Sequence, residues 1–481
     1  MNKKSINIYW FKRDLRLYDN EPLHEASLQS EKLLLIYFLE DKLINDPHYS
    51  SFHWNFVKQS IEDINVCLGK KSILFLNCDP IKGLKKISEI YNIKSIYSHK
   101  ETGIELTYLR DIDVKKYCDI NFIQWLEYDK NYVKRGLKNR KNWIKGWNEY
   151  VKSSVLNIDI KKLDILDIKH LSKVFNVIDT KTNKNKQLQP GGTSNGLRYL
   201  KSFLDVRNKN YNQNISKPLE SRSSCSRLSP YLSWGNLSSR YVWQQANESI
   251  KKGNSSFQIR SFLSRLRWNS HFIQRFEMEP RIQFESVNRG YKLLKKKKRK
   301  NYYESWKNGK TGYPLVDASI LCLKSTGYLN FRMRSMIVSF LTHHLWQPWQ
   351  SASYFLAQNF LDFEPGIHYS QLQMQAGETG VNTIRIYNPT KNAFEKDKQG
   401  IFIKKWLPQL KEVPIPLIFE PWKMSDIEQK LFNCKIAKDY PKPIVDISTT
   451  RKFALEQLWG LRKIKIVKNE KNRILEKHIN H

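Results

Sequence analysis

Residues 5–20 read SINIYWFKRDLRLYDN, and this stretch decides how the amino-terminal part of the chain folds. Its first six residues, Ser5 to Trp10, are mostly β-branched, aromatic or apolar, which is typical of a strand buried on both faces. No G-x-G-x-x-G follows this run, so the usual cradle for a dinucleotide is absent. A polar segment with three basic side chains stands in its place.

Similar strand-like runs recur over the first 130 residues and alternate with helix-spaced apolar residues. We expect strands at residues 5–10, 33–39, 72–77, 95–98 and 121–125, and helices at 54–68, 81–90 and 104–117. Strands that alternate with helices form βαβ crossovers and a parallel sheet. The sequence therefore predicts an α/β domain at 1–130, with a flavodoxin-like parallel sheet covered by helices on both faces.

The composition and the apolar pattern of the chain change after this domain. Residues 131–190 are polar and lysine-rich, which is typical of an interdomain connector, and a Pro-Gly-Gly turn at 190–192 ends it. Helix-spaced apolar and aromatic residues dominate 191–450, which predicts an all-α domain. The tail, residues 451–481, is basic. The clearest helical patterns cover 256–276, 315–323 and 332–346.

Composition excludes several classes of protein. With 481 residues, 40% of them hydrophobic, the chain can bury large cores and is neither disordered nor fibrous. It holds no run of about 18 apolar residues, so we expect no membrane span. Six scattered cysteines form no C-x-x-C pair, which argues against a zinc or iron–sulfur site. Without a secretory signal, a reduced, cytoplasmic location is expected.

The charge is distributed unevenly. The formal net charge is +36, yet residues 1–130 hold 19 basic and 19 acidic side chains, so the whole excess follows them. Such a one-sided excess indicates a polyanion partner, either nucleic acid or an anionic membrane surface. Lysine enrichment in an A·T-rich genome is the alternative, but it does not explain a neutral first quarter. The basic run at 295–300 and the tail are either solvated or in contact with phosphates.

Two features carry chemistry. Residues 226–238, SRLSPYLSWGNLS, place hydroxyls and an arginine before a helical run, which suits a phosphate, although a serine there is also an ordinary helix cap. Arg334 and Asp362 lie among apolar neighbours, and burial of either charge is costly unless they pair. Such a pair could hold the edge of a heteroaromatic ring or simply tie two helices together.

Five motifs occur in one order and together resemble the DNA photolyase/cryptochrome flavoprotein family. The resemblance spans about residues 5–430. The motifs are WFKRDLRLYDN at 10–20, SRLSPYLSWG at 226–235, GKTGYPLVDA at 309–318, STGYL at 325–329 and YNP at 387–389.

The resemblance implies an FAD held in a U shape within the helical domain. Arg334 and Asp362 match the ion pair beside the isoalloxazine ring. Cys225 stands where relatives usually have threonine, which removes one hydroxyl donor but leaves the backbone donors. The residues that match the family's segment around the diphosphate are Tyr211, Cys225, Ser226, Arg227, Leu228 and Ser229; those that match the rest of the pocket are Phe262, Phe363 and Glu364.

The resemblance also implies an activity, a light-driven DNA repair lyase. In photolyases a reduced flavin absorbs blue or near-ultraviolet light and donates an electron to a pyrimidine dimer that has left the duplex. Trp268 matches a tryptophan that stacks on the lesion. The expected DNA-binding residues are Arg265, Trp268, Asn269 and Met374. A second, antenna chromophore (folate, deazaflavin or flavin) in residues 1–130 is an open expectation.

Departures from the family pattern cluster around the flavin. Arg265 replaces a glutamate that hydrogen-bonds the dimer, and Leu372 replaces the first tryptophan of the usual electron chain. Trp349 matches only the middle member of that chain, so photoreduction needs another route, such as Trp346, Tyr369 or Tyr354. Met374 replaces a second stacking tryptophan.

His368 stands near the expected position of the flavin N5. It either donates a proton, as a histidine does in (6-4) photolyases, or is bonded to backbone at a helix start. Four functions stay open at this stage: a repair lyase for pyrimidine dimers, a lyase for (6-4) or other lesions, a cryptochrome-like sensor, and a nucleic-acid-binding protein with a vestigial site. We expect a monomer that binds damaged DNA and no membrane.

The charge distribution yields a first prediction. Ultraviolet-damaged DNA should bind the part after residue 130, with an affinity that falls steeply between about 50 and 200 mM salt, because each neutralised phosphate releases counterions. Titration at several salt concentrations, combined with mapping of DNA–protein crosslinks, measures both properties. A flat salt response, or crosslinks confined to residues 1–130, would contradict it.

Overall fold

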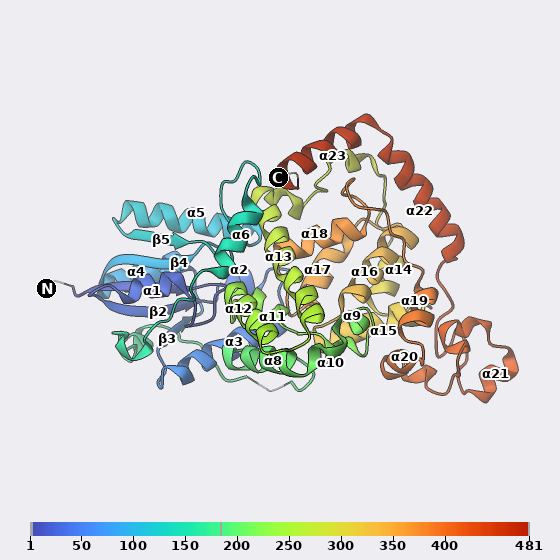
Figure 1. The fold of residues 1–481 in the computed structure, drawn as a ribbon, viewed down its shortest axis with the longest axis horizontal. Helices are drawn as coiled ribbons and strands as arrows, with labels where there is room; N and C mark the ends of the chain where they lie inside the picture. Colours follow the sequence, from blue (N-terminus) through green and yellow to red (C-terminus); the bar gives the residue numbers. More distant parts are fainter. Residues whose placement is uncertain (1–2, 183–184, 480–481) are drawn as a thin grey trace.

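The computed structural model describes residues 3–182 and 185–479. A sheet-containing amino-terminal part and a larger helical part lie next to each other (Figure 1). This arrangement confirms the predicted order of an α/β domain followed by an all-α domain. The strands are β1 Ser5–Phe11, β2 Lys32–Phe38, β3 Ile73–Leu76, β4 Asn92–His99 and β5 Gln124–Tyr128.

The sheet has the strand order β3-β2-β1-β4-β5, and all four pairings are parallel. Alternate residues of β1 point into different cores: Tyr9 packs with residues of α1 and α3, and Trp10 with residues of α4 and α5. Helices therefore cover both faces, as predicted. Their bounds are α1 Glu21–Ser27, α2 Asp41–Ile44, α3 Ser51–Cys67, α4 Pro80–Ile90 and α5 Glu105–Ile120.

Two details of this domain differ from the sequence prediction. Strand β5 begins three residues later than expected, because Phe122 adopts a left-handed φ of 56° in the turn after α5. The short helices α1 and α2 were not predicted, since each is too short to show a helical period.

Residues 156–182 fold back onto the sheet, whereas residues 131–153 pack against the helical part, where the Trp143 Nε1–H donates to Gln274 (3.1 Å). The Leu33 N–H donates to the Asp164 carbonyl (2.9 Å), and the Leu166 N–H donates to the Leu33 carbonyl (3.0 Å). A second contact, between Leu76 and Val177, continues this wrapping. The second half of the connector is thus part of the amino-terminal body. The helices of the whole connector are α6 Trp143–Lys152, η1 Ile160–Lys162 and α7 Leu171–Val174.

The helical part surrounds a separate core in which Trp306 and Trp349 are fully buried. Helices α13 and α18 pack closely, because a Cβ at Gly366 would lie 2.6 Å from the Ile273 Cα. The bounds are α8 Thr193–Asp205, η2 Arg207–Asn210, α9 Tyr211–Asn214, α10 Ser221–Ser224, α11 Ser229–Ser233, α12 Ser239–Lys251, α13 Ser256–Met278, η3 Pro280–Gln283, η4 Arg289–Leu293, α14 Lys300–Lys307, α15 Pro314–Thr326, α16 Phe331–Ser339, the π-helical η5 Phe340–His344, α17 Gln350–Asn359, α18 Pro365–Gln375, α19 Pro389–Lys396, α20 Ile401–Trp406, η6 Pro408–Leu410, η7 Leu417–Phe419, η8 Pro421–Lys423 and α21 Asp426–Leu431.

The basic tail forms two helices, α22 Ile447–Arg462 and α23 Lys465–His478, that run along the edge of the helical part (Figure 1). Glu279, at the end of α13, accepts from Arg473 (2.7 Å) and from His478 (2.8 Å). These bonds anchor α23 on the helical part. In the basic run at 295–300, Lys296 is paired with Glu378 at 3.0 Å, while its neighbours are exposed.

The six cysteines are all free thiols. No helix of the described residues is long and apolar enough to cross a membrane.

The polar segment after β1 fastens the two parts together. Arg13 donates to the Ser233 hydroxyl (2.8 Å), Arg16 donates to the Gly235 carbonyl (2.9 Å), and the Leu15 N–H donates to the Trp234 carbonyl (3.2 Å). Gly235 has a φ of 74°, and a Cβ there would lie 2.2 Å from the Arg13 carbonyl oxygen. The segment that replaces a dinucleotide cradle is therefore an interdomain contact.

Trp234 is the central side chain of this contact. Its ring packs against Trp54 and Tyr49, the Arg13 guanidinium lies 4.6 Å from the ring centroid, and its Nε1–H donates to the Leu361 carbonyl (3.0 Å). Trp234→Ala should reduce the free energy of unfolding by about 3–5 kcal/mol, because a large cavity opens between the two parts.

Denaturant unfolding followed by circular dichroism checks this value. The matched control is Trp459→Ala on α22, where the side chain is 49% exposed and the cost should stay below about 1 kcal/mol. Equal losses in the two variants would contradict the role of Trp234 in joining the two parts.

Candidate functional site

A cavity of about 350 Å³ lies in the helical part, bounded by α9, the loop at 225–229, α13, α16 and α18. It brings together most residues that the sequence singled out, although they are far apart along the chain. The predicted residues that line it are Tyr211, Cys225, Ser226, Arg227, Leu228, Ser229, Arg265, Trp268, Asn269, Arg334, Asp362, Phe363, Glu364, His368 and Leu372.

Arg334 and Asp362 form the expected ion pair on the cavity wall. Two parallel hydrogen bonds join them, Nη1 to Oδ1 at 3.0 Å and Nη2 to Oδ2 at 2.9 Å, a geometry that fixes both side chains. Burial alone would raise the pKa of Asp362, but Arg334 and a hydrogen bond from Ser229 hold that pKa below its usual value. The pair is therefore charged and carries a guanidinium along one edge of the cavity.

Arg227 is a buried cation without an ion-pair partner among the described residues. Its backbone has a left-handed φ of 60°, and its guanidinium lies 3.7 Å from the centroid of the Tyr328 ring. Nη2 donates to Gln189 (2.7 Å), but Nε has no hydrogen-bond partner among the described residues. Burial lowers the pKa of Arg227, which is the penalty that a negatively charged ligand would remove.

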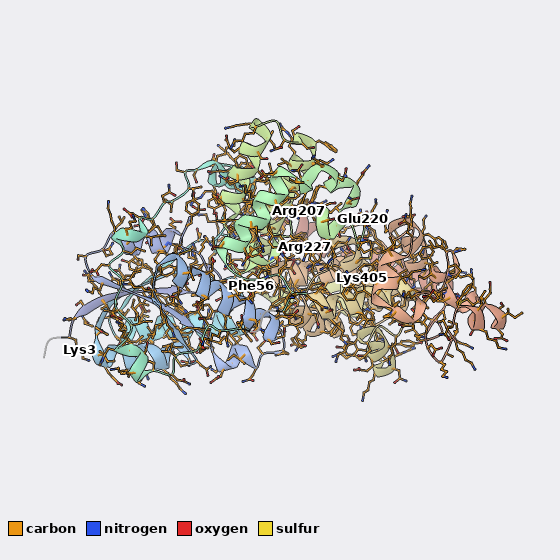
Figure 2. The ribbon with its side chains drawn as sticks, turned by 90° about the horizontal axis from the view of Figure 1, so that it is seen from below. Lys3, Phe56, Arg207, Glu220, Arg227 and Lys405 are labelled. Atoms are coloured by element: carbon orange, nitrogen blue, oxygen red, sulfur yellow. The ribbon has the colours of Figure 1, made fainter. Side chains whose placement is uncertain are left out.

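Arg207 holds the loop from behind and was not identified from the sequence. Its guanidinium donates to the carbonyls of Cys225 and Ser226, the latter at 3.2 Å, and it lies near Arg227 (Figure 2). Because it stands in a polar stretch that looks like an exposed turn, no sequence signal distinguishes it. The Cys225 thiol is buried, which raises its pKa to about 11, so the loop offers backbone groups here and no ionised sulfur.

His368 lies in the first turn of α18 and faces the cavity. Its Nε2–H donates to the Ser353 carbonyl at 3.0 Å, so the ring presents an unprotonated Nδ1. Burial lowers the pKa of His368 to about 3, which leaves the imidazole neutral near pH 7. Of the two options that the sequence left open for His368, the structure shows the hydrogen bond to backbone. The residue also lies beside the cavity.

Three predicted residues do not line the cavity. Phe262 packs edge-on against Phe203 (4.9 Å between ring centroids) and lies behind Tyr211, whose ring it supports. On α18, residues 368, 371, 372 and 375 face the cavity, and the helical period directs Met374 away from it. Trp349 is fully buried in the neighbouring core. Phe262 therefore lies one layer behind the cavity wall in this structure, and its role at the cofactor stays a prediction.

The rim of the cavity is aromatic and basic. Trp268 is 48% exposed and packs against Phe272 and His271. Arg265, one helical turn earlier on α13, hydrogen-bonds the Tyr211 hydroxyl, and its side chain is otherwise exposed. Such a rim can stack on a base and attract a phosphate backbone.

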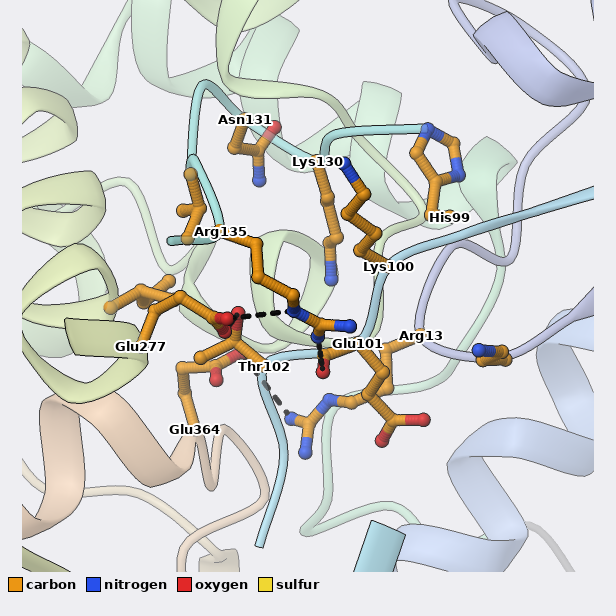
Figure 3. A pocket seen from close by; sticks show the side chains of 13 residues that line it. Arg13, His99, Lys100, Glu101, Thr102, Lys130, Asn131, Arg135, Glu277 and Glu364 are labelled. Carbon is orange, nitrogen blue, oxygen red and sulfur yellow. Dashed lines mark hydrogen bonds and ion pairs between the residues drawn. The ribbon is translucent and has the colours of Figure 1, made fainter. Parts of the chain in front are cut away.

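A second, much smaller cavity of about 30 Å³ lies between the two parts, where the strand order reverses between β1 and β4 (Figure 3). Arg13 faces Glu364 across it at 3.7 Å, and Arg135 pairs with Glu277 at 2.8 Å. Burial lowers the pKa of Lys130 to about 8. Charged side chains fill this switch point, leaving room for roughly one or two water molecules.

Comparison with known protein families agrees with this architecture. Residues 7–135 match the family model described as DNA photolyase, and residues 262–460 match the FAD binding domain of DNA photolyase. Together the two matches span more than half of the chain. The chain belongs to the DNA photolyase/cryptochrome family and carries its FAD-binding domain.

Relatives with different names are similarly distant. A deoxyribodipyrimidine photo-lyase of Alkalihalophilus pseudofirmus is 27% identical, over 95% of this chain and 99% of its own. A cryptochrome DASH of Synechocystis is also 27% identical, over 94% and 98%.

Solved structures show the same fold. The Synechocystis cryptochrome has a TM-score of 0.82 at 22% identity and covers 95% of this chain and 99% of its own. An archaeal photolyase from Sulfolobus tokodaii, solved with two FAD molecules, has a TM-score of 0.74 at 24% identity, over 94% and 99%.

The residues of the larger cavity fit FAD. Its volume is in the range of about 300–1,000 Å³ that is typical of ligand pockets. Two residues that line it, Arg227 and Asn330, each have a buried polar atom (Nε and Oδ1) without a hydrogen-bond partner in the described part of the chain. A diphosphate would supply an acceptor for Arg227, and the Arg334–Asp362 pair can hold a polar ring edge.

A substitution in the ion pair tests this fit. Asp362→Asn should lower the affinity for FAD by roughly tenfold or more, because hydrogen bonds to charged groups contribute about 1.5–3 kcal/mol. Fluorescence titration of released and rebound FAD measures the change. Asp426→Asn, an exposed carboxylate at the start of α21, is the matched control. Unchanged affinity in both variants would remove Asp362 from the site.

Proposed function

We propose that this protein is a light-driven, FAD-dependent lyase that splits ultraviolet-induced pyrimidine dimers in DNA. The observation that carries the proposal is one cavity that combines the Arg334–Asp362 pair and Arg227, whose Nε has no partner among the described residues, with an exposed Trp268 at its rim. A cofactor pocket and a platform for a base thus share one opening.

The chain's own residues hold and orient the cofactor. Arg227 and the backbone of the Ser226–Ser229 loop would bind the diphosphate, and Arg207 keeps that loop in place. Arg334 and Asp362 would orient the ring edge. FAD, when bound, supplies the light absorption and the electron that splits the dimer. The electron then returns to the flavin. Cyclobutane splitting needs no proton donor, which agrees with a site whose histidine is neutral.

The rim would receive the lesion. A damaged, poorly stacked base pair costs little to open, so the dimer can leave the duplex and enter the cavity. Trp268 offers a ring for stacking, and the exposed arginines of α13, Arg260, Arg265 and Arg267, can contact the flanking phosphates. Apolar wall residues such as Phe363 and Leu372 exclude water from the opposite side.

The protonation state of His368 bears on which lesion the protein would repair. A (6-4) photolyase uses a histidine as an acid, whereas this imidazole is buried and neutral, with its Nε2–H already donated to Ser353. As it stands the ring cannot donate a proton to a lesion at Nδ1. This favours the cyclobutane dimer over the (6-4) product as the substrate.

A second candidate function is a cryptochrome-like light sensor. Arg265 occupies the place of the glutamate that bonds the dimer, and Leu372 lines the cavity where the family's electron-chain tryptophan stands. Both departures would weaken repair without weakening flavin binding. The repair assay below separates the two functions.

An antenna chromophore in residues 1–130 stays a prediction. The cavity at the strand switch point, of about 30 Å³, is too small for a folate or a flavin unless the charged side chains around it move. The second FAD of the Sulfolobus tokodaii photolyase is a property of that protein.

The test is illumination of the chemically reduced protein with DNA that contains a single cyclobutane dimer or a single (6-4) product. We expect restoration of the cyclobutane dimer and little change in the other. Trp268→Ala should raise KM by roughly tenfold, since base stacking contributes about 1–3 kcal/mol. Phe257→Ala, an aromatic of α13 that is 70% exposed and lies outside the cavity, should not.

Restoration of neither lesion, from a preparation with bound flavin, would contradict the repair function and favour the sensor. Restoration of the (6-4) product alone would contradict the substrate assignment.

A further inference from the structure

Three residues form a hydrogen-bonded relay across the boundary between the two parts. The Tyr369 hydroxyl, on α18, donates to Nε2 of His48, and Nδ1 of His48 lies 2.6 Å from Oδ1 of Asp46. His48 and Asp46 belong to the loop between α2 and α3. Tyr369 is 1% exposed and His48 is 2% exposed, so water does not replace these bonds.

The hydrogen-bond network assigns the proton positions. A carboxylate only accepts, so Nδ1 of His48 carries the hydrogen that is donated to Asp46. In the neutral imidazole Nε2 is then the acceptor of the phenol hydrogen. Asp46 also accepts from the His48 backbone N–H at 2.9 Å, which fixes the loop and the ring together. Tyr369 therefore faces a positioned base.

This relay lies between the FAD cavity and the surface. The Tyr369 ring meets the edge of His368 at 5.2 Å between centroids, and the His48 ring stacks on Phe363 at 5.4 Å; both partners line the cavity. On the other side, Tyr354 packs edge-on against His48 at 4.8 Å and is 46% exposed. A chain of aromatic contacts thus leads from the cavity to solvent.

We propose that Tyr369 is a proton-coupled electron donor to the flavin and that His48, held by Asp46, is its proton acceptor. The inference rests on the FAD site proposed above. Tyr369 loses one electron to the light-excited, oxidised flavin, and its O–H bond breaks as the proton moves to Nε2 of His48. The phenol becomes a neutral phenoxyl radical and the imidazole an imidazolium, while the flavin gains one electron. An external thiol then gives one electron to the radical and becomes a thiyl radical, its own proton passes to water, and His48 returns its proton to the phenol.

Two further observations fit this assignment. Burial raises the pKa of the Tyr369 phenol, so no phenolate is present to donate an electron without a base. Trp349, 6.1 Å from Tyr369 between ring centroids, donates its Nε1–H to the Ser286 hydroxyl, which is no proton acceptor of comparable strength. Leu372, on the cavity wall, has no redox chemistry. Tyr369 thus combines a position beside the cavity with a hydrogen bond to an imidazole.

The experiment uses the full chain with bound oxidised FAD, whose retention is verified first by absorbance. Samples illuminated with a thiol present and frozen rapidly are measured by electron paramagnetic resonance, with natural and with ring-deuterated tyrosine. We expect a tyrosyl spectrum that narrows on deuteration and disappears in Tyr369→Phe. Flavin photoreduction in that variant should slow by about tenfold or more.

His48→Gln and Asp46→Asn retain the phenol but remove or loosen its base. We expect both to slow photoreduction and to abolish its slowing in deuterated water, whereas the control Tyr303→Phe, a half-buried tyrosine outside the cavity lining, should behave as the unmodified chain does.

A tyrosyl signal that persists in Tyr369→Phe, a tryptophanyl signal alone, or an unchanged photoreduction rate in the relay variants would overturn the proposal. If a variant fails to retain FAD, the unmodified chain with ring-deuterated tyrosine still tests the proposal. Flavin-bound protein that forms no tyrosyl radical on illumination would contradict the relay. Unmodified protein that binds no FAD would instead contradict the proposed function itself.

Discussion

The bidentate ion pair between Arg334 and Asp362 is the interaction on which the site depends. Asp362 stands in a short loop whose neighbouring carbonyls are held by the amino-terminal contact: Trp234 donates to the Leu361 carbonyl, and Arg13 and Ser233 donate to that of Phe363. The segment after β1 therefore positions the carboxylate, and the carboxylate positions the guanidinium. Sheet and helical part contribute to one pocket through this chain of contacts.

Charge and burial together locate the cofactor. Buried cations are costly unless an anion compensates them, and Arg227 has a free Nε beside the cavity. At the strand switch point, by contrast, Arg13 and Arg135 already face the carboxylates of Glu364 and Glu277. The two arginines of the switch point are thus paired with carboxylates, whereas Arg227 has no ion-pair partner among the described residues.

Much of the fold could be predicted from periodicity, because β1 to β4 and the long helices carry unbroken apolar patterns. The Arg334–Asp362 pair was predictable because two charges in apolar surroundings must meet. Phe262 lies one layer behind the cavity wall because its neighbour Tyr211 takes the inner layer, which only packing reveals. The contact of His48 with Tyr369 joins residues 321 positions apart, so no local pattern could indicate it.

The central claim is that a flavin dinucleotide occupies the cavity of the helical part. The most direct measurement is the visible absorption spectrum of the purified chain, followed by quantification of the nucleotide released on denaturation. The account predicts a coloured protein that releases one FAD per chain. A colourless protein that stays colourless after incubation with FAD would contradict it.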